Sequence, residues 1–191
     1  MELKIALCGA HRSGKSTLAK AFAKEHGIKY LDMGTSNVAR RLNIDVSKQV
    51  SPEDRKRLQT GLLSHYAQEI RTSGSWIADR SVFDLILYCF MEYPSEYDWV
   101  TAYAADCELL ASHLTHLVYV PSVIPVTAEE GKASIAPDVL LKADLLIRGC
   151  VSRFIEDRQS PYLDLRFFRL NQTMNSVEQR VRQMSTMLQL F

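Results

Sequence analysis

The chain has 191 residues, which suits one domain built around one substantial hydrophobic core. Its 23 basic and 22 acidic residues leave a formal net charge of +1, so the chain as a whole has no strong attraction for nucleic acid or for an anionic membrane. No stretch approaches the ~20 apolar residues that a membrane-spanning helix requires. The 4 cysteines are widely spaced and form neither a CxxC pair nor a zinc-binding cluster. These features predict a cytoplasmic protein with reduced thiols and no membrane partner.

Short apolar runs alternate with longer amphipathic segments, and this alternation predicts a parallel sheet covered by helices. The predicted strands cover residues 3–8, 28–31, 75–78, 116–120 and 166–170. The predicted helices cover residues 16–26, 35–42, 52–72, 82–92, 96–114, 137–156 and 176–190. Residues 122–136 have mixed polarity and contain Pro125 and Gly131, which indicates a long loop or lid. The elements together predict a single three-layer α/β domain over residues 1–191.

The segment 9–16, with the sequence GAHRSGKS, matches the phosphate-binding pattern G-x-x-x-x-G-K-[ST] at every fixed position. It follows a predicted strand and precedes a predicted helix, which is the context that phosphate binding requires. Gly9 and Gly14 permit backbone angles and a close approach that a Cβ would obstruct. The successive amides then form an anion nest at the positive end of the helix. We therefore expect this loop to bind a nucleoside triphosphate together with Mg²⁺.

The residues of this loop have distinct expected roles. Lys15 would reach the β- and γ-phosphates, the hydroxyl of Ser16 would hold Mg²⁺, and Thr17 would support the α-phosphate region. Arg12 either contacts phosphate during transfer or points to solvent, whereas His11 is expected to fill the loop rather than act as a general base. The predicted nucleotide-binding residues are Gly9, Ala10, His11, Arg12, Ser13, Gly14, Lys15, Ser16 and Thr17.

Polar residues follow the second and third predicted strands. The carboxyl ends of parallel strands line the ligand crevice in this class of fold, so these residues are expected to face a ligand. Asp79, Arg80 and Ser81 come directly after the third strand. Asp79 either orients the Mg²⁺ shell or accepts the proton of an acceptor hydroxyl, and Arg80 offers a bidentate fork for phosphate. Asp32, which follows the second strand, is the competing base. The structural alternative is an Asp79 helix cap beside a surface Arg80.

Two further segments offer groups for an acceptor. Ser36 and Arg40 belong to the predicted helix after the second strand, and they suit either a sugar and phosphate or a solvated helix face. Asp84 and Tyr88 lie one helical turn apart, so we expect both to line the acceptor pocket, with a core position as the alternative for Tyr88. The predicted acceptor-binding residues are Asp32, Ser36, Arg40, Arg80, Asp84 and Tyr88.

These motifs resemble the small P-loop nucleotide and nucleoside kinase-like proteins that are often classed as AAA-type ATPases. Such proteins are common in bacteriophages and are akin to the ribosylnicotinamide kinase domain. The resemblance extends over roughly residues 1–157 and is carried by residues 9–17, 30–32, 79–88, 119–126 and 129–132. It implies a P-loop kinase fold with strand order 2-3-1-4-5, ATP and Mg²⁺ as cofactors, and a bacterial or phage-infected host cytoplasm.

The resemblance also implies residue roles. Asp79 and Arg80 would act like the acid–arginine pair that nucleoside and thymidylate kinases carry after their third strand. Lys132 would lie in a lid that closes over the phosphates, where related proteins often have an arginine, although lysine cannot form the same fork. Arg148 and Arg153, on the helix after the lid, are either further candidates for this role or surface residues. The predicted catalytic residues are Lys15, Asp79, Asp32, Arg80 and Lys132.

The leading hypothesis is a kinase, monomeric or homodimeric, that phosphorylates a (deoxy)nucleoside monophosphate or a nucleoside. An alternative acceptor is a hydroxymethylpyrimidine base within DNA. The basic run at residues 55–57 either supplies positive charge for DNA binding or forms a solvated helix face. The competing class is a P-loop ATPase or a switch module that responds to nucleotide binding. The sequence has no guanine-reading N-K-x-D segment, which argues against a GTPase switch. An oligomeric AAA motor is disfavoured because no apolar strand ends in paired acids and little room remains for a helical subdomain.

Overall fold

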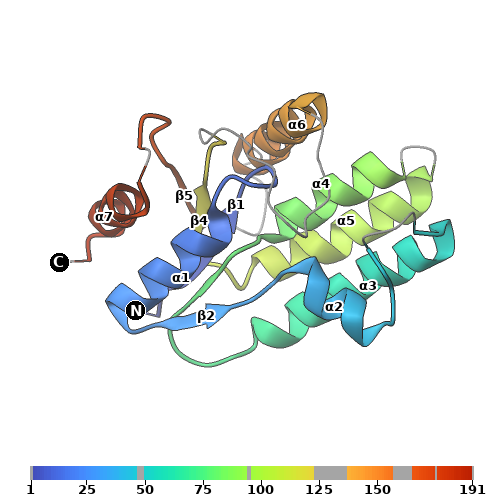
Figure 1. The fold of residues 1–191 in the computed structure, drawn as a ribbon, viewed down its shortest axis with the longest axis horizontal. Coiled ribbons are helices and arrows are strands. Elements are labelled where there is room, and N and C mark those ends of the chain that lie inside the picture. The colour runs from blue at the N-terminus through green and yellow to red at the C-terminus, as the bar shows by residue number, and fades with distance from the viewer. Residues whose placement is uncertain are drawn as a thin grey trace.

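The computed structural model describes residues 2–46, 50–93, 96–122, 137–156, 165–174 and 176–190. Five parallel strands form one sheet in the order β2-β3-β1-β4-β5, which confirms the predicted strand order (Figure 1). The strands are β1 (Lys4–Cys8), β2 (Lys29–Leu31), β3 (Trp76–Ala78), β4 (His116–Tyr119) and β5 (Arg166–Arg169). β1 lies at the centre, so the loop that follows it emerges in the middle of the carboxyl edge of the sheet.

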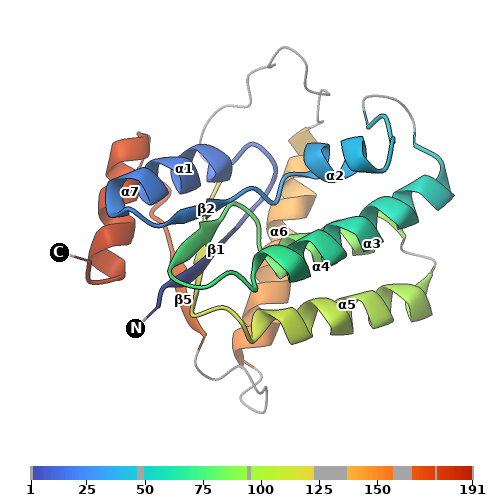
Figure 2. The same ribbon diagram turned by 90° about the horizontal axis from the view of Figure 1, so that it is seen from below.

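Helices cover both faces of this sheet, as Figures 1 and 2 show from two directions. α1 (Lys15–His26) and α7 (Val177–Met187) pack side by side on one face. The other face carries α2 (Thr35–Arg41), α3 (Pro52–Glu69), α4 (Val82–Glu92), α5 (Tyr97–Ala111) and α6 (Pro137–Glu156). None of the helices in the described part of the chain is long and apolar enough to cross a membrane.

The alternation of side chains along β1 explains why two helical layers form. Ile5 and Leu7 belong to the apolar cluster beneath α1 and α7, whereas Ala6 and Cys8 belong to the cluster beneath the other helices. All four residues are fully buried, and burying a leucine or isoleucine contributes about 1.5–3 kcal/mol relative to leaving it exposed. A strand that is apolar on both faces is typical of a parallel sheet enclosed between helices.

Three helices end three residues earlier than the sequence predicts. α3, α5 and α7 end at Glu69, Ala111 and Met187, where we expected them to continue to 72, 114 and 190. Beyond these ends the backbone tightens into turns with hydrogen bonds between residues three apart. The amide of Thr72 donates to the carbonyl of Glu69 (3.2 Å), and the amide of Leu114 donates to the carbonyl of Ala111 (3.0 Å). Apart from Ser122, the predicted lid at 122–136 lies outside the described residues, and so does Lys132.

Candidate active site

The loop between β1 and α1 has the backbone geometry of an anion nest. Gly9, Arg12 and Gly14 all have positive φ angles (150°, 61° and 85°), and Gly14 is the left-handed N-cap of α1. A Cβ on Gly9 would lie 2.4 Å from the carbonyl oxygen of Val120, just after β4. The chain therefore requires glycine at position 9, because the loop passes against the neighbouring strand without room for a side chain.

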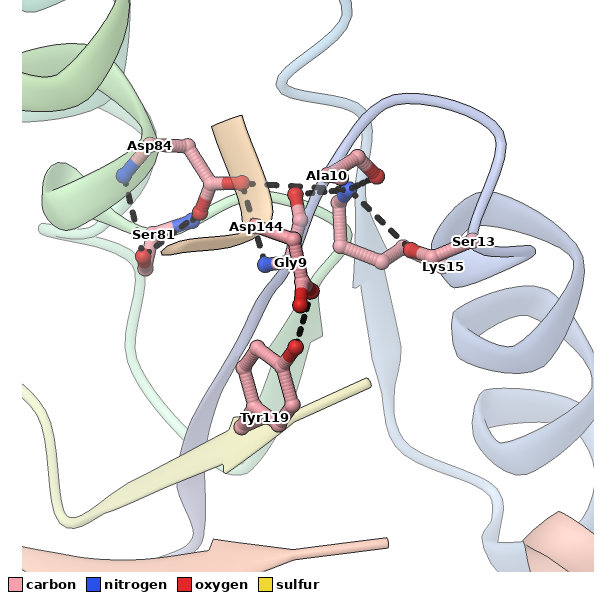
Figure 3. A network of polar contacts seen from close by, with 8 residues as sticks. All are labelled: Gly9, Ala10, Ser13, Lys15, Ser81, Asp84, Tyr119 and Asp144. Atoms are coloured by element: carbon pink, nitrogen blue, oxygen red, sulfur yellow. Dashed lines mark hydrogen bonds and ion pairs between the residues drawn. The ribbon is translucent and has the colours of Figure 1, made fainter. Parts of the chain in front are cut away.

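Lys15 folds back into this loop. Its ammonium donates hydrogen bonds to the carbonyls of Gly9 (2.6 Å) and Ala10 (2.8 Å), and it lies 3.4 Å from the hydroxyl of Ser13 (Figure 3). Only 9% of Lys15 is exposed, and burial lowers the pKa of its ammonium group. Ser16, which follows it, is exposed at the start of α1, as is Thr17. The loop thus concentrates one positive charge and a row of backbone amides at a single point.

Asp84 holds the loop from the opposite side. Its carboxylate accepts hydrogen bonds from the amide of Gly9 (3.3 Å) and from the amide and hydroxyl of Ser81 (3.0 and 2.6 Å), and it lies 3.8 Å from the ammonium of Lys15. Ser81 caps α4, so the capping box of this helix also anchors the phosphate loop. Burial raises the pKa of Asp84, while the ammonium of Lys15 acts in the opposite direction. Asp84 therefore contacts the phosphate loop. Its spacing in the sequence placed it only with Tyr88 in the acceptor pocket and did not indicate this contact.

His11 and Arg80 both lie against the ring of Tyr88. The ring of His11 lies 4.3 Å from the ring of Tyr88 on α4, and the guanidinium of Arg80 lies 5.9 Å from the centre of the same tyrosine ring. Burial, with smaller contributions from Arg80, Lys15 and Arg12, lowers the pKa of His11 to about 3. His11 is consequently a neutral imidazole at neutral pH, packed between the loop and α4.

This neutral histidine makes stability depend on pH. Between pH 7.5 and 5.0 the unfolded chain binds a proton at His11 that the folded protein does not bind, so the free energy of unfolding falls as the pH falls. We expect His11→Asn to remove up to about 2 kcal/mol of this dependence, as measured by urea unfolding at both pH values. The exposed His113 provides the control, because His113→Asn should leave the dependence intact. Equal pH dependence in wild type and His11→Asn would contradict the assignment.

The two candidate bases lie at the ends of neighbouring strands. Asp79 is 3% exposed, and its carboxylate accepts hydrogen bonds from the hydroxyl of Tyr30 (2.9 Å) and the amide of Met33 (3.0 Å). Asp32 is exposed, and its carboxylate accepts from the amide of Gly34 (2.9 Å) and the side-chain amide of Asn37 (3.1 Å). Asp79 thus joins β3 to β2, whereas Asp32 presents a carboxylate to solvent at the edge of the site.

The other predicted residues that the structure describes lie on α2 and α6. Ser36 and Arg40 are exposed one turn apart on α2. Arg148 donates to the hydroxyl of Tyr119 (3.0 Å) and pairs with Asp144 (2.7 Å), and Figure 3 shows the hydroxyl of Tyr119 bonded to Asp144. These contacts fasten α6 to the end of β4. Arg153 is exposed farther along α6.

One residue of the site was not predicted from the sequence. Arg180 on α7 is 2% exposed and donates a hydrogen bond from Nη1 to the carbonyl of Ser13 in the phosphate loop (2.7 Å). The sequence does contain a signal for it, because Arg180 interrupts the apolar stripe that Val177, Val181 and Met184 form on this helix.

A phosphate loop after the central strand of a parallel sheet, with the strand order 2-3-1-4-5, gives this chain the fold of the small P-loop kinases. The family model described as an AAA domain matches residues 4–149, and the chain belongs to this family. No curated protein matches the sequence.

Solved structures share the fold over nearly the whole chain. Deoxyadenosine kinase from M. mycoides, bound to its products dCMP and dCDP, has a TM-score of 0.69 at 14% identity, with 98% of each chain covered. The YorR protein from Bacillus subtilis, in complex with phosphorylated GDP, has a TM-score of 0.57 at 16% identity, with 97% of this chain and 95% of that one covered. Shikimate kinase from Aquifex aeolicus has a TM-score of 0.54 at 14% identity, with 98% and 96% covered.

Proposed function

We propose that this protein is an ATP-dependent kinase that phosphorylates a small nucleotide-like acceptor, either a (deoxy)nucleoside monophosphate or a nucleoside. The observation that carries the proposal is the placement of Asp32, Asp79 and Arg80 at the carboxyl ends of β2 and β3, of which β3 pairs with the strand that leads into the phosphate loop. The similarity in fold to deoxyadenosine kinase over the full chain supports the same class of acceptor.

The loop fits a triphosphate with Mg²⁺. Its amides form a nest, Lys15 supplies a mobile positive charge, and the exposed hydroxyl of Ser16 would hold the ion. Bound Mg²⁺ supplies charge neutralisation at the phosphates. Asp79 is buried and accepts its hydrogen bonds from Tyr30 and Met33, so we place it as a support for the β2 and β3 ends rather than as a direct ligand of the ion.

Asp32 is better placed than Asp79 to accept the proton of the acceptor hydroxyl. Its carboxylate is accessible, and the hydrogen bonds from Gly34 and Asn37 fix its orientation. Arg80 is half-buried over the ring of Tyr88, and its charge acts on His11 and Lys15 in the loop, so it would hold a phosphate oxygen of the donor or the acceptor. Transfer then depends on positioning and charge stabilisation more than on covalent chemistry.

A matched pair of substitutions tests the assignment of the base. We expect Asp32→Asn to lower kcat for transfer by roughly a hundredfold or more while leaving the KM for ATP unchanged. We expect Asp79→Asn to retain most of the turnover of the folded protein and to lower the midpoint of urea unfolding, because Asp79 is the buried link to Tyr30 and Met33. The opposite pattern, with turnover lost only in Asp79→Asn, would assign the base to Asp79.

The acceptor itself is identified by turnover with a panel. ATP and Mg²⁺ would be incubated with nucleosides, nucleoside monophosphates, ribosylnicotinamide and DNA that contains hydroxymethylpyrimidines, and the products resolved by mass. We expect a phosphorylated small molecule. ATP binding without any phosphorylated product would instead favour the ATPase or switch module and would lead to a search for a protein partner.

The basic run on α3 gives the DNA alternative little support. Arg55 donates to the carbonyl of Val50 (3.1 Å), Arg57 pairs with Asp54 (2.6 Å), and Lys56 pairs with Glu96. These three charges are therefore engaged in contacts at and near the start of α3. Phosphorylation of DNA in the panel, weakened steeply by added salt, would restore that alternative.

A further inference from the structure

Arg180 is a buried cation that lies next to the buried apolar residues Val181 and Met184 on α7. Its Nη1 donates to the carbonyl of Ser13 (2.7 Å) in the phosphate loop, 167 residues away in the sequence, and its Nε donates to the carbonyl of Met174 (3.0 Å) in the turn after β5. Its Nη2 is buried and has no hydrogen-bond partner among the described residues. Arginine is almost never fully buried unless it is paired, and an unpaired guanidinium nitrogen costs free energy. An apolar residue would stabilise this helix face more simply.

The bond to Ser13 acts on the backbone of the phosphate loop. The described chain contains no cis peptide bond, so in the planar trans peptide that joins Ser13 to Gly14 the carbonyl and the amide point in opposite directions. A donor that holds the carbonyl of Ser13 on the α7 side therefore keeps the amide of Gly14 directed to the other side of the loop. The amide of Gly14 is one of the successive backbone amides that form a phosphate-binding nest.

We infer that Arg180 is a positioning residue of the nucleotide site, which holds the Ser13–Gly14 peptide in the orientation that binds phosphate and couples it to the turn after β5. The inference rests on the proposed nucleotide binding at this loop and goes beyond it, because it assigns a role to a helix that lies outside the family match at residues 4–149. Burial lowers the pKa of Arg180, but arginine remains protonated at neutral pH, so its charge also lies behind the loop.

ATP affinity tests this role separately from phosphoryl transfer. Binding of ATP and of inorganic triphosphate would be measured by titration calorimetry for Arg180→Gln, Arg180→Lys and the control Arg182→Gln, at a temperature where each is folded. Arg182 is exposed on the same helix. We expect affinity to fall about tenfold in Arg180→Gln, by less in Arg180→Lys, which keeps the charge and a donor, and by less than twofold in the control.

The amide resonance of Gly14 gives a readout that a purely structural role would not move. We expect it to shift in Arg180→Gln and to stay in place in Arg182→Gln. A folded Arg180→Gln protein with ATP affinity within twofold of wild type and an unchanged Gly14 amide would overturn the inference. If Arg180→Gln does not fold, the wild-type protein decides: saturating ATP should shift the Nε–H resonance of Arg180, and an unmoved resonance overturns the inference. ATP binding without transfer to any acceptor would overturn the proposed kinase activity and leave this inference intact.

Discussion

Replacing Lys15 with methionine is expected to lower the rate of phosphoryl transfer at least about a thousandfold. The ammonium is the charge that the phosphate loop holds at the point where the nest amides converge, and its present partners are the carbonyls of Gly9 and Ala10. Those carbonyls would be replaced by the more negative oxygens of a bound phosphate. Initial rates with the acceptor that the panel identifies would measure the effect, and Lys24→Met, exposed on the same helix, is the control.

The loss of activity must be separated from a loss of folding, because Lys15→Met leaves the carboxylate of Asp84 buried without its cation. The double variant Lys15→Met/Asp84→Asn removes the charge from both partners. We expect it to be more stable than the sum of the single changes predicts and still to lack transfer activity. Recovery of activity in the double variant would show that Lys15 acts only through stability.

Removing Asp84 is expected to have the largest effect on folding. Asp84→Ala should lower the free energy of unfolding by about 3–5 kcal/mol, because it leaves the buried ammonium of Lys15 unpaired and breaks the bonds to Gly9 and Ser81. Urea unfolding followed by circular dichroism measures this change. ATP affinity of the folded protein should fall as well, since the amide of Gly9 loses its acceptor.

Asp54 provides a matched control for this prediction. It occupies the same third position of α3 that Asp84 occupies in α4, and both helices begin with a serine cap, Ser51 and Ser81. Its ion pair with Arg57 is exposed, so Asp54→Ala should cost less than about 1 kcal/mol. Similar costs for the two alanine variants would mean that the contact between Asp84 and the phosphate loop contributes little.

The sheet and the position of the phosphate loop could be predicted from sequence because each depends on a local pattern. Apolar strands, amphipathic helices and the glycine–lysine spacing of residues 9–16 all lie within short windows. The strand order was implied by the resemblance to P-loop kinases, and the structure confirms it. The last turns of α3, α5 and α7 were misplaced, since apolar periodicity continues through residues whose backbone tightens into a turn.

The contacts around the loop could not be predicted in the same way, because they join residues that are distant in the sequence. Spacing on one helix placed Asp84 with Tyr88, but spacing cannot show that the carboxylate reaches Gly9, 75 residues earlier. Arg180 differs, because an arginine within an apolar stripe is a visible anomaly, although nothing in the sequence names Ser13 as its partner. The proposed roles of Lys132 and Arg153 stay predictions.

The fate of the γ-phosphate of ATP is the most direct test of the central claim. Wild-type protein would be given ATP labelled at the γ-phosphate, with and without the acceptor panel, and the label in organic product would be compared with the label in inorganic phosphate. We predict slow release of inorganic phosphate without acceptor, and transfer of most of the label to one small nucleotide-like acceptor, which Lys15→Met abolishes. Rapid release of inorganic phosphate that no acceptor changes would contradict the kinase assignment and identify the protein as an ATPase.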